Sequence, residues 1–230
     1  MYIYGKNVAI ESLEKNKHIK KAYIYEKFND KNIINQLNKK NINTIYATKA
    51  DLNHLVRGNH QGIILEVDDY NYASLDEIEN ENVIVMLDHI EDPHNLGAII
   101  RTCEAAGLKA IIIPKDRAVK VNSTVIKVSA GAAANVKISM VNNLVNTIKK
   151  LKNRGYWIIG TDMNGQDYRN IDYQGKIVIV IGNEGKGLSR LVEANCDFIT
   201  SIPMNGKINS LNASVAAALI IYEVVRNRGI

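Results

Sequence analysis

A glycine-rich stretch near the end of the sequence, residues 181–189 (IGNEGKGLS), has the composition of a loop that binds phosphate. A phosphate loop of the GxxxxGK[ST] type needs a lysine after its second glycine, but Leu188 follows Gly187 here. A dinucleotide-binding GxGxxG motif needs a third glycine where this sequence has Arg190. Glycines also let backbone groups approach a neutral or zwitterionic ligand, and Glu184 disfavours an anion in this loop. The alternative is a plain turn between a strand and a helix.

Two further stretches place polar residues where loops meet helical patterns. LDHIEDPHNLGAIIRTCEAAG carries Asn95 just before such a pattern and Arg101 within it. INSLNASVAAALIIYEVVRNR carries Ser210 and Asn212 at the start of an alanine-rich pattern. Taken alone, an asparagine in this position is an N-cap and an arginine on a helix is a surface charge. The residues gain a functional interpretation only together with the glycine loop.

The elements around these stretches alternate between strands and helices from residue 82 onward. Near-continuous Val/Ile runs are typical of parallel strands that helices cover on both faces, which predicts an α/β fold. The expected strands are residues 83–90, 110–114, 136–140, 157–162, 177–182 and 198–204, and the expected helices are residues 95–107, 123–133, 144–155, 189–195 and about 210–226.

The first part of the chain predicts a second, smaller α/β unit, residues 1–67. The acidic segment 68–81 has no regular apolar period and is the expected linker to a domain over residues 82–230. In the small unit we expect helices over residues 9–16, 29–41 and 49–58 and strands over residues 21–26, 43–48 and 62–67.

Charge is distributed unevenly along the 230 residues, whose formal net charge is +5. Residues 1–60 contain eleven Lys and Arg against five Asp and Glu, whereas residues 61–81 contain seven acidic residues and no Lys or Arg. Basic surfaces on soluble proteins favour polyanions such as nucleic acid. The alternative is a lysine-rich surface that is merely solvated.

Membrane and disulfide classes are disfavoured. No apolar run approaches the roughly 20 residues that cross a bilayer, and the N-terminus lacks a signal pattern, so we expect a cytoplasmic protein without membrane contact. Cys103 and Cys196 are isolated, which predicts neither a disulfide framework nor a metal site. Both are expected to be small buried hydrophobic residues.

Taken in order, DPHNLGAIIRTCEAAG, IVIVIGNEGKGLS and IPMNGKINSLNASVAAALIIYE resemble the three motifs of the SPOUT superfamily, in its TrmH/RlmB branch of RNA ribose 2′-O-methyltransferases. The resemblance covers residues 82–230. YGKNVAIESL and HQGIILEV resemble the small RNA-binding domain fused to RlmB-type enzymes, which is similar to a ribosomal protein. The resemblance implies a C-terminal trefoil knot, a rare kind of fold, and a homodimer.

The same resemblance implies S-adenosylmethionine as the methyl donor, held mainly by backbone groups of three loops, and no metal. The implied donor-binding residues are Thr161, Asp162, Met163, Gly182, Ile202, Met204 and Leu211. The implied catalytic residues are Asn95, Arg101, Glu184, Ser210 and Asn212.

A ribose 2′-hydroxyl is a weak nucleophile, so a group must accept its proton. Accounts of the family give this role to the arginine, here Arg101, aided by a substrate phosphate. Because a guanidinium loses its proton very unfavourably, we favour Arg101 as a clamp on the adjacent phosphate that also stabilises the developing alkoxide. Glu184 is expected to orient Arg101.

The implied substrate is RNA, and we expect a guanosine in large-subunit (23S) rRNA. Candidate RNA contacts are Lys6, Arg57 and His60 in the small unit and Arg117 in the larger one, although each could be only a solvated charge. Two alternatives stay open within the enzyme class: tRNA, or another rRNA nucleotide, including methylation that confers antibiotic resistance. A third alternative is an RNA-binding ribosome-assembly factor that has lost catalysis.

Overall fold

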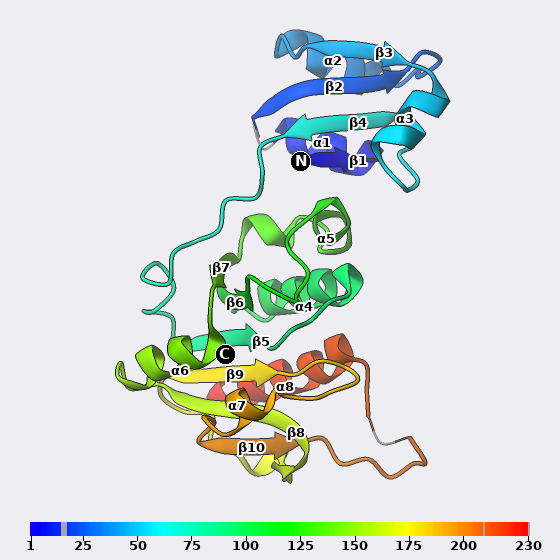
Figure 1. The fold of residues 1–230 in the computed structure, drawn as a ribbon. Helices are drawn as coiled ribbons and strands as arrows, with labels where there is room; N and C mark the ends of the chain where they lie inside the picture. The colour runs from blue at the N-terminus through cyan, green and yellow to red at the C-terminus, as the bar shows by residue number, and fades with distance from the viewer. Residues whose placement is uncertain (15–17, 209, 230) are drawn as a thin grey trace. The chain divides into compact units, whose positions relative to one another are not determined.

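The computed structural model describes residues 1–14, 18–208 and 210–229, and the described part divides into two compact units. One unit comprises residues 1–71 with residues 121–127, and the other comprises residues 72–120 and the remainder from residue 128 (Figure 1). The domain limits expected from the sequence, 1–67 and 82–230, remain a prediction. The end of the helix expected over residues 9–16 lies outside the described residues.

The larger unit is built on a parallel sheet, as the Val/Ile runs predict. Its order among the described residues is β10-β8-β9-β5-β6-β7, and each neighbouring pair is parallel. The residues of the central strands are buried throughout, because helices cover both faces. The strands are β5 (Val83–Leu87), β6 (Ala110–Pro114), β7 (Lys137–Val141), β8 (Trp157–Asp167), β9 (Ile177–Ile181) and β10 (Phe198–Ser201).

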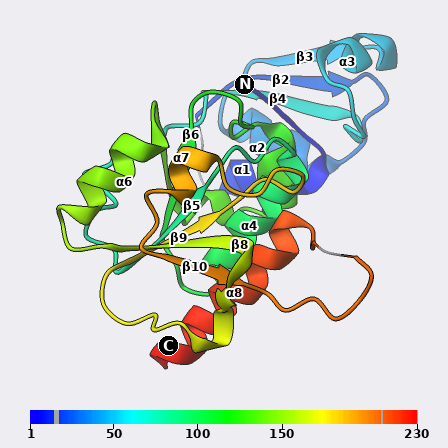
Figure 2. The same cartoon turned by 60° about the horizontal axis from the view of Figure 1, so that its bottom comes forward.

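Helices form a layer on each side of this sheet (Figure 2). On one side α4 (Pro93–Ala105) packs against α8 (Ala213–Arg228). On the other side α6 (Leu144–Lys152) and α7 (Arg190–Glu193) share a buried cluster with β5, β6, β8 and β9. Two shorter elements, η1 (Ala132–Ala134) and η2 (Tyr168–Asn170), complete the connections, whereas α5 (Ser123–Val128) falls almost entirely within residues 121–127 of the smaller unit.

The acidic segment at residues 72–81 packs on the larger unit through its apolar and backbone groups. Ala73 forms a parallel bridge with Ser139 of β7, and Ile78 is fully buried. The hydroxyl of Tyr156 donates to two backbone carbonyls of the segment, at 2.7 and 2.5 Å. The acidic side chains of residues 72–81 therefore belong to a segment that is attached to the edge of the sheet.

The smaller unit has a mixed sheet in the order β1-β4-β2-β3, in which β2 and β3 are parallel and the other pairs antiparallel. β1 is not among the strands expected from the sequence, because its three residues are too few to show a period. The elements are β1 (Tyr2–Tyr4), α1 (Lys6–Glu14), β2 (Ile19–Tyr25), α2 (Lys31–Lys39), β3 (Thr44–Ala47), α3 (Lys49–Leu55) and β4 (Ile63–Val67).

Several element ends differ from the expected ones for local reasons. The strand expected over residues 83–90 ends at Leu87, because His89 adopts a left-handed backbone with φ of 59°. The helix expected from residue 210 begins at Ala213, because the side chain of Asn212 accepts from the backbone of Ser214 and caps it.

The cysteines are both free, as expected, and differ in burial. Cys103 is fully buried in α4, whereas Cys196 is only partly buried, which corrects the expectation that both lie in the core. Burial raises the pKa of each thiol to about 12, so neither is a reactive thiolate near neutral pH.

Candidate active site

A cavity of about 380 Å³ lies between the middle of β8, the loops after β9 and β10, and the start of α8. Ligands of open parallel sheets bind outside the carboxyl ends of the strands, and this volume is within the range of small-molecule sites. The cavity is lined by Thr161, Asp162, Met163, Asn164, Ile181, Gly182, Asn183, Glu184, Gly185, Lys186, Gly187, Thr200, Ser201, Ile202, Met204, Ser210, Leu211, Ala213, Ala216 and Ile220.

The structure brings together all the residues that the resemblance implies for donor binding. They come from three separate parts of the chain: the strand β8, the loop after β9 and the loop after β10. Lining the one cavity are Thr161, Asp162, Met163, Gly182, Ile202, Met204 and Leu211. Their contact with a ligand remains a prediction.

The glycine loop closes on itself. The backbone amide of Asn183 donates to the carbonyl of Gly187 at 3.0 Å, and the amide of Gly187 donates back to Asn183 at 2.9 Å. A Cβ on Gly182 would lie 2.4 Å from the carbonyl carbon of Gly187, closer than any side chain tolerates. Glycine is therefore required at position 182 by closure of the loop, in addition to any approach of a ligand.

A chain of polar side chains connects the three motifs beside the cavity. The side-chain amide of Asn95 donates to the carboxylate of Glu184, and the amide of Asn212 donates to the carbonyl oxygen of Asn95 at 3.0 Å. Asn95 is 7% exposed, so these bonds are largely shielded from water. Ser210 lies on the cavity wall.

Arg101 stands apart from this group. It is exposed on α4 and makes no hydrogen bond or ion pair with any residue that the structure describes. Six residues of helix separate it from Asn95, which places it about 120° around the helix axis. Glu184 bonds to Asn95 within this chain, so the expected orientation of Arg101 by Glu184 is not what the structure shows.

Asp88 and Asn183, to which the sequence alone assigns no role, hold the base of the glycine loop through hydrogen bonds. The carboxylate of Asp88, whose side chain is 1% exposed, accepts from the backbone amide of Ser189 at 2.6 Å and pairs with the ring of His89. The side-chain amide of Asn183 donates to the carbonyl of His89 at 2.9 Å. The signal in the sequence that could have indicated Asp88 is an acidic residue directly after a fully apolar strand.

His60 is the one candidate RNA contact that the structure removes from the surface. It is 6% exposed, and its Nδ1 accepts from the backbone amide of Gly62 at 3.0 Å, so the neutral ring carries its proton on Nε2 and donates to Asn53 at 3.1 Å. Burial, with a smaller effect of Lys49, lowers the pKa of His60. A neutral, engaged imidazole stabilises this turn and offers no charge to a phosphate.

The other candidate RNA contacts remain at the surface. Lys6 pairs with Asp30 at 3.5 Å, and its side chain is 41% exposed. Arg57 and Arg117 are exposed, and Arg117 has a left-handed backbone with φ of 51°. Their contact with RNA stays a prediction.

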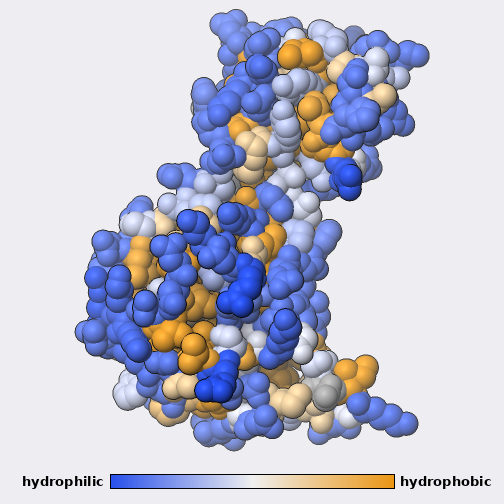
Figure 3. Space-filling view, in the orientation of Figure 1, coloured by the Kyte–Doolittle hydropathy of each residue, from blue (hydrophilic) through white to orange (hydrophobic). Residues whose placement is uncertain are grey.

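The surface is mainly hydrophilic in the view of Figure 3, with hydrophobic patches between the polar groups. Large apolar side chains are also exposed on α8, where Val215, Leu219 and Tyr222 are 48%, 40% and 51% exposed. Among the described residues no helix is long and apolar enough to span a bilayer, and no group of three or more His, Cys, Asp or Glu side chains is placed to hold a metal.

Two family descriptions match the chain. Residues 82–222 match the SpoU rRNA methylase family, and residues 2–73 match the domain described as RNA 2′-O ribose methyltransferase substrate binding. A Bacillus subtilis relative, named the TrmH family tRNA/rRNA methyltransferase YacO, is 42% identical over 238 residues, covering 99% of this chain and 96% of the relative.

Solved structures of the same kind share the fold. The SpoU methyltransferase AviRb from Streptomyces viridochromogenes, in complex with AdoMet, superposes with a TM-score of 0.81 at 26% identity, covering 99% of this chain and 90% of that one. The AdoMet-bound rRNA methyltransferase from Sinorhizobium meliloti gives 0.78 at 25% identity, covering 98% and 86%. The TrmH/SpoU tRNA modifying enzyme from A. aeolicus gives 0.61 at 34% identity, covering 65% and 77%.

Proposed function

This chain belongs to the SpoU rRNA methylase family, and from that premise we propose that it transfers the methyl group of S-adenosylmethionine to a ribose 2′-hydroxyl of RNA. The observation that carries the proposal is the cavity of about 380 Å³, whose walls come from residues 161–164 of β8 and from the loops after β9 and β10. The Asn95–Glu184–Asn212 chain of hydrogen bonds links all three sequence motifs at this place.

The charges of the cavity suit this donor. S-adenosylmethionine carries a sulfonium, an ammonium and a carboxylate, which together give one positive charge. Asp162 and Glu184 contribute two carboxylates to the lining against the single ammonium of Lys186. This balance supports a cationic ligand and disfavours the phosphates that the glycine loop at first suggests.

The residues proposed to hold the donor are those of the three loops, above all Thr161, Gly182, Ile202 and Leu211. The bound donor supplies an electrophilic methyl group. The chain itself must hold the 2′-oxygen in line, and such positioning contributes on the order of 7–11 kcal/mol to barrier reduction. The unpaired guanidinium of Arg101 is suited to grip the neighbouring phosphate through two parallel hydrogen bonds and to stabilise the developing alkoxide.

We further propose a guanosine of 23S rRNA as the substrate. The S. meliloti structure that covers 98% of this chain is named an rRNA methyltransferase, whereas the A. aeolicus tRNA modifying enzyme covers 65%. The match of residues 2–73 to a domain described as RNA 2′-O ribose methyltransferase substrate binding supports RNA as the substrate class. tRNA is the second candidate, because the B. subtilis relative is named for both RNA classes.

The trefoil knot, the homodimer and a cytoplasmic location belong to the same proposal. The exposed apolar residues of α8 support a second copy of the chain as the partner of that helix. An assembly factor without catalysis is disfavoured, because all the polar residues of the three motifs are present, and one from each motif (Asn95, Glu184 and Asn212) takes part in the same chain of hydrogen bonds.

The test combines donor binding with transfer. Calorimetry with the purified full chain should detect S-adenosylmethionine, and Arg101→Ala should abolish methyl transfer to rRNA while donor binding and RNA binding persist. Arg101→Lys should restore only a minor part of the rate, since an ammonium cannot form the two parallel bonds. Mapping 2′-O-methyls in rRNA and tRNA with and without the protein identifies the substrate; absence of donor uptake by the wild-type chain would overturn the function.

A further inference from the structure

The pairing of strand β8 with its neighbour β10 is interrupted and then resumes. Gly160 pairs with Ile199, but the next residue of β10, Thr200, pairs with Gln166. Residues 161–165 are therefore extruded from the sheet, with no counterpart on β10. A break of this size re-aims the side chains of the extruded segment.

The extruded segment forms one wall of the cavity. Thr161, Asp162, Met163 and Asn164 line it, whereas Gly165 does not. The hydroxyl of Thr161 donates to the carbonyl of Val180 at 3.0 Å, which ties the near end of the segment to β9. The position of this wall depends on how the far end is held.

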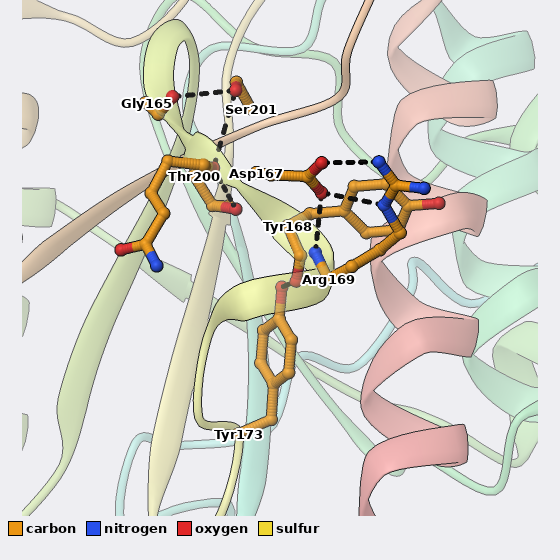
Figure 4. A network of polar contacts seen from close by, with 8 residues as sticks. Gly165, Asp167, Tyr168, Arg169, Tyr173, Thr200 and Ser201 are labelled. Carbon is orange, nitrogen blue, oxygen red and sulfur yellow. Dashed lines mark hydrogen bonds and ion pairs between the residues drawn. The ribbon is translucent and has the colours of Figure 1, made fainter.

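Two hydroxyls and one glycine hold that far end (Figure 4). Ser201 donates from Oγ to the carbonyl of Gly165 at 2.8 Å, and Thr200 donates from Oγ1 to the carbonyl of Gln166 at 3.1 Å. Thr200 is fully buried. A Cβ on Gly165 would lie 2.6 Å from the carbonyl carbon of Thr200, so only glycine allows this close approach.

The chain just beyond this point is also fixed (Figure 4). Asp167 accepts two side-chain bonds from Arg169, at 3.0 and 2.5 Å, and the hydrogen bonds from Arg169 hold the pKa of Asp167 down to about 2. The hydroxyl of Tyr173 donates to the carbonyl of Tyr168 at 2.8 Å. The turn that follows the far end of the segment is therefore held by these side-chain hydrogen bonds.

We propose that Gly165, Thr200 and Ser201 are positioning residues that clasp residues 161–165 against β10 and so set the wall against which the methyl donor binds. The inference rests on the proposed function, because it concerns the affinity of the same cavity for S-adenosylmethionine. The clasp joins two of the segments that line the cavity, residues 161–164 of β8 and the loop after β10, because Ile202 of that loop directly follows Ser201. Loss of the clasp weakens donor binding and leaves the RNA-binding surface unchanged.

The first test removes the hydroxyls one at a time in the full-length protein. Thr200→Val keeps the shape and removes the donor group, and Ser201→Ala does the same with little loss of volume. Each should raise the Kd and the KM for S-adenosylmethionine about three- to tenfold, as expected for one lost hydrogen bond. RNA affinity should change less than about twofold, and Thr200→Ser should restore the donor affinity.

The second test separates positioning from direct contact. Because Gly165 does not line the cavity, a loss of donor affinity in Gly165→Ala must act through the segment. Gly206→Ala is the matched control, since a Cβ there meets no atom within 4 Å. Far-UV circular dichroism and the melting temperature establish that each variant is folded.

The outcomes distinguish the two proposals. If the wild-type chain binds no S-adenosylmethionine, the proposed function fails. If the wild-type binds it and folded Thr200→Val, Ser201→Ala and Gly165→Ala bind equally well, the clasp is wrong and the function stands. A parallel loss of RNA affinity, turnover and melting temperature, without rescue by Thr200→Ser, also contradicts the clasp.

Discussion

Asn95 and Asn212, which are 117 positions apart in the sequence, share a side-chain hydrogen bond of 3.0 Å. Asn212 also caps α8 through the backbone amide of Ser214, and Asn95 uses its own amide for the carboxylate of Glu184. One buried amide thus fixes the relative position of two helix starts and of the glycine loop.

Asn95→Ala should lower the rate of methyl transfer at least tenfold. The change leaves the half-buried Glu184 carboxylate and the exposed Asn212 amide without their partner, and loss of the bond to the charged carboxylate costs about 1.5–3 kcal/mol. Single-turnover transfer and urea denaturation measure the two effects. Asn153→Ala, at an exposed asparagine, is the control, and equal rates for both variants would show that the polar chain has no part in the reaction.

Gly182→Ala should abolish donor binding. The new Cβ would meet the backbone of Gly187 at 2.4 Å, so the loop must open to admit it. Calorimetry with S-adenosylmethionine checks this, and Gly206→Ala, where a Cβ meets nothing within 4 Å, should bind normally. Normal affinity in Gly182→Ala would mean that closure of the loop does not shape the cavity.

Acid should weaken the smaller unit through His60. Burial lowers the pKa of the folded ring below its ordinary value of 6.5, so the unfolded chain takes up the proton first as the pH falls. The stabilisation is fully present above about pH 6.5 and is lost as the pH falls toward the folded pKa. Hydrogen-exchange protection of β4, measured between pH 5 and pH 7.5, should show this loss in wild type.

His60→Gln should flatten the pH dependence of β4 protection, whatever its effect on stability at neutral pH. His54→Gln, at an exposed histidine of α3, should leave the wild-type dependence in place. If wild type, His60→Gln and His54→Gln all show the same pH dependence of β4 protection, a titratable group other than His60 causes it.

Leu219→Glu should convert the proposed dimer into a monomer. Leu219 lies one turn from Val215 on α8 and is 40% exposed, so a second copy would bury it. Light scattering after gel filtration measures the mass. Leu191→Glu is the matched control, because Leu191 is 64% exposed on α7, on the other side of the sheet. A monomeric wild type, or a dimeric Leu219→Glu, would contradict this interface.

Much of this architecture is predictable from the sequence, because its signals are local. Apolar runs mark the buried strands, and glycine or asparagine marks the loops where they end. The three motif loops are assigned through the resemblance of their sequences to a known family, which places the residues around Gly182 and Leu211 in one site before the cavity is seen.

The remainder depends on partners distant in the sequence. The break in β8 carries little local signal, because the hydroxyls that hold it lie 34 and 36 residues away, at Thr200 and Ser201. The burial of His60 likewise depends on how α3 and β4 meet, whereas its residue type alone suggests a surface charge. The identity of a basic residue indicates the chemistry of its side chain, but it does not determine whether that side chain is exposed.

The pairing of β5 with β9 has a consequence for biosynthesis. Leu87 lies opposite Ile181, so the middle of the sheet cannot close until the ribosome has made the chain through β9. Until then β5 exposes an apolar edge to the solvent, which is the condition under which nascent chains aggregate. The strand order therefore favours slow closure of the sheet during translation.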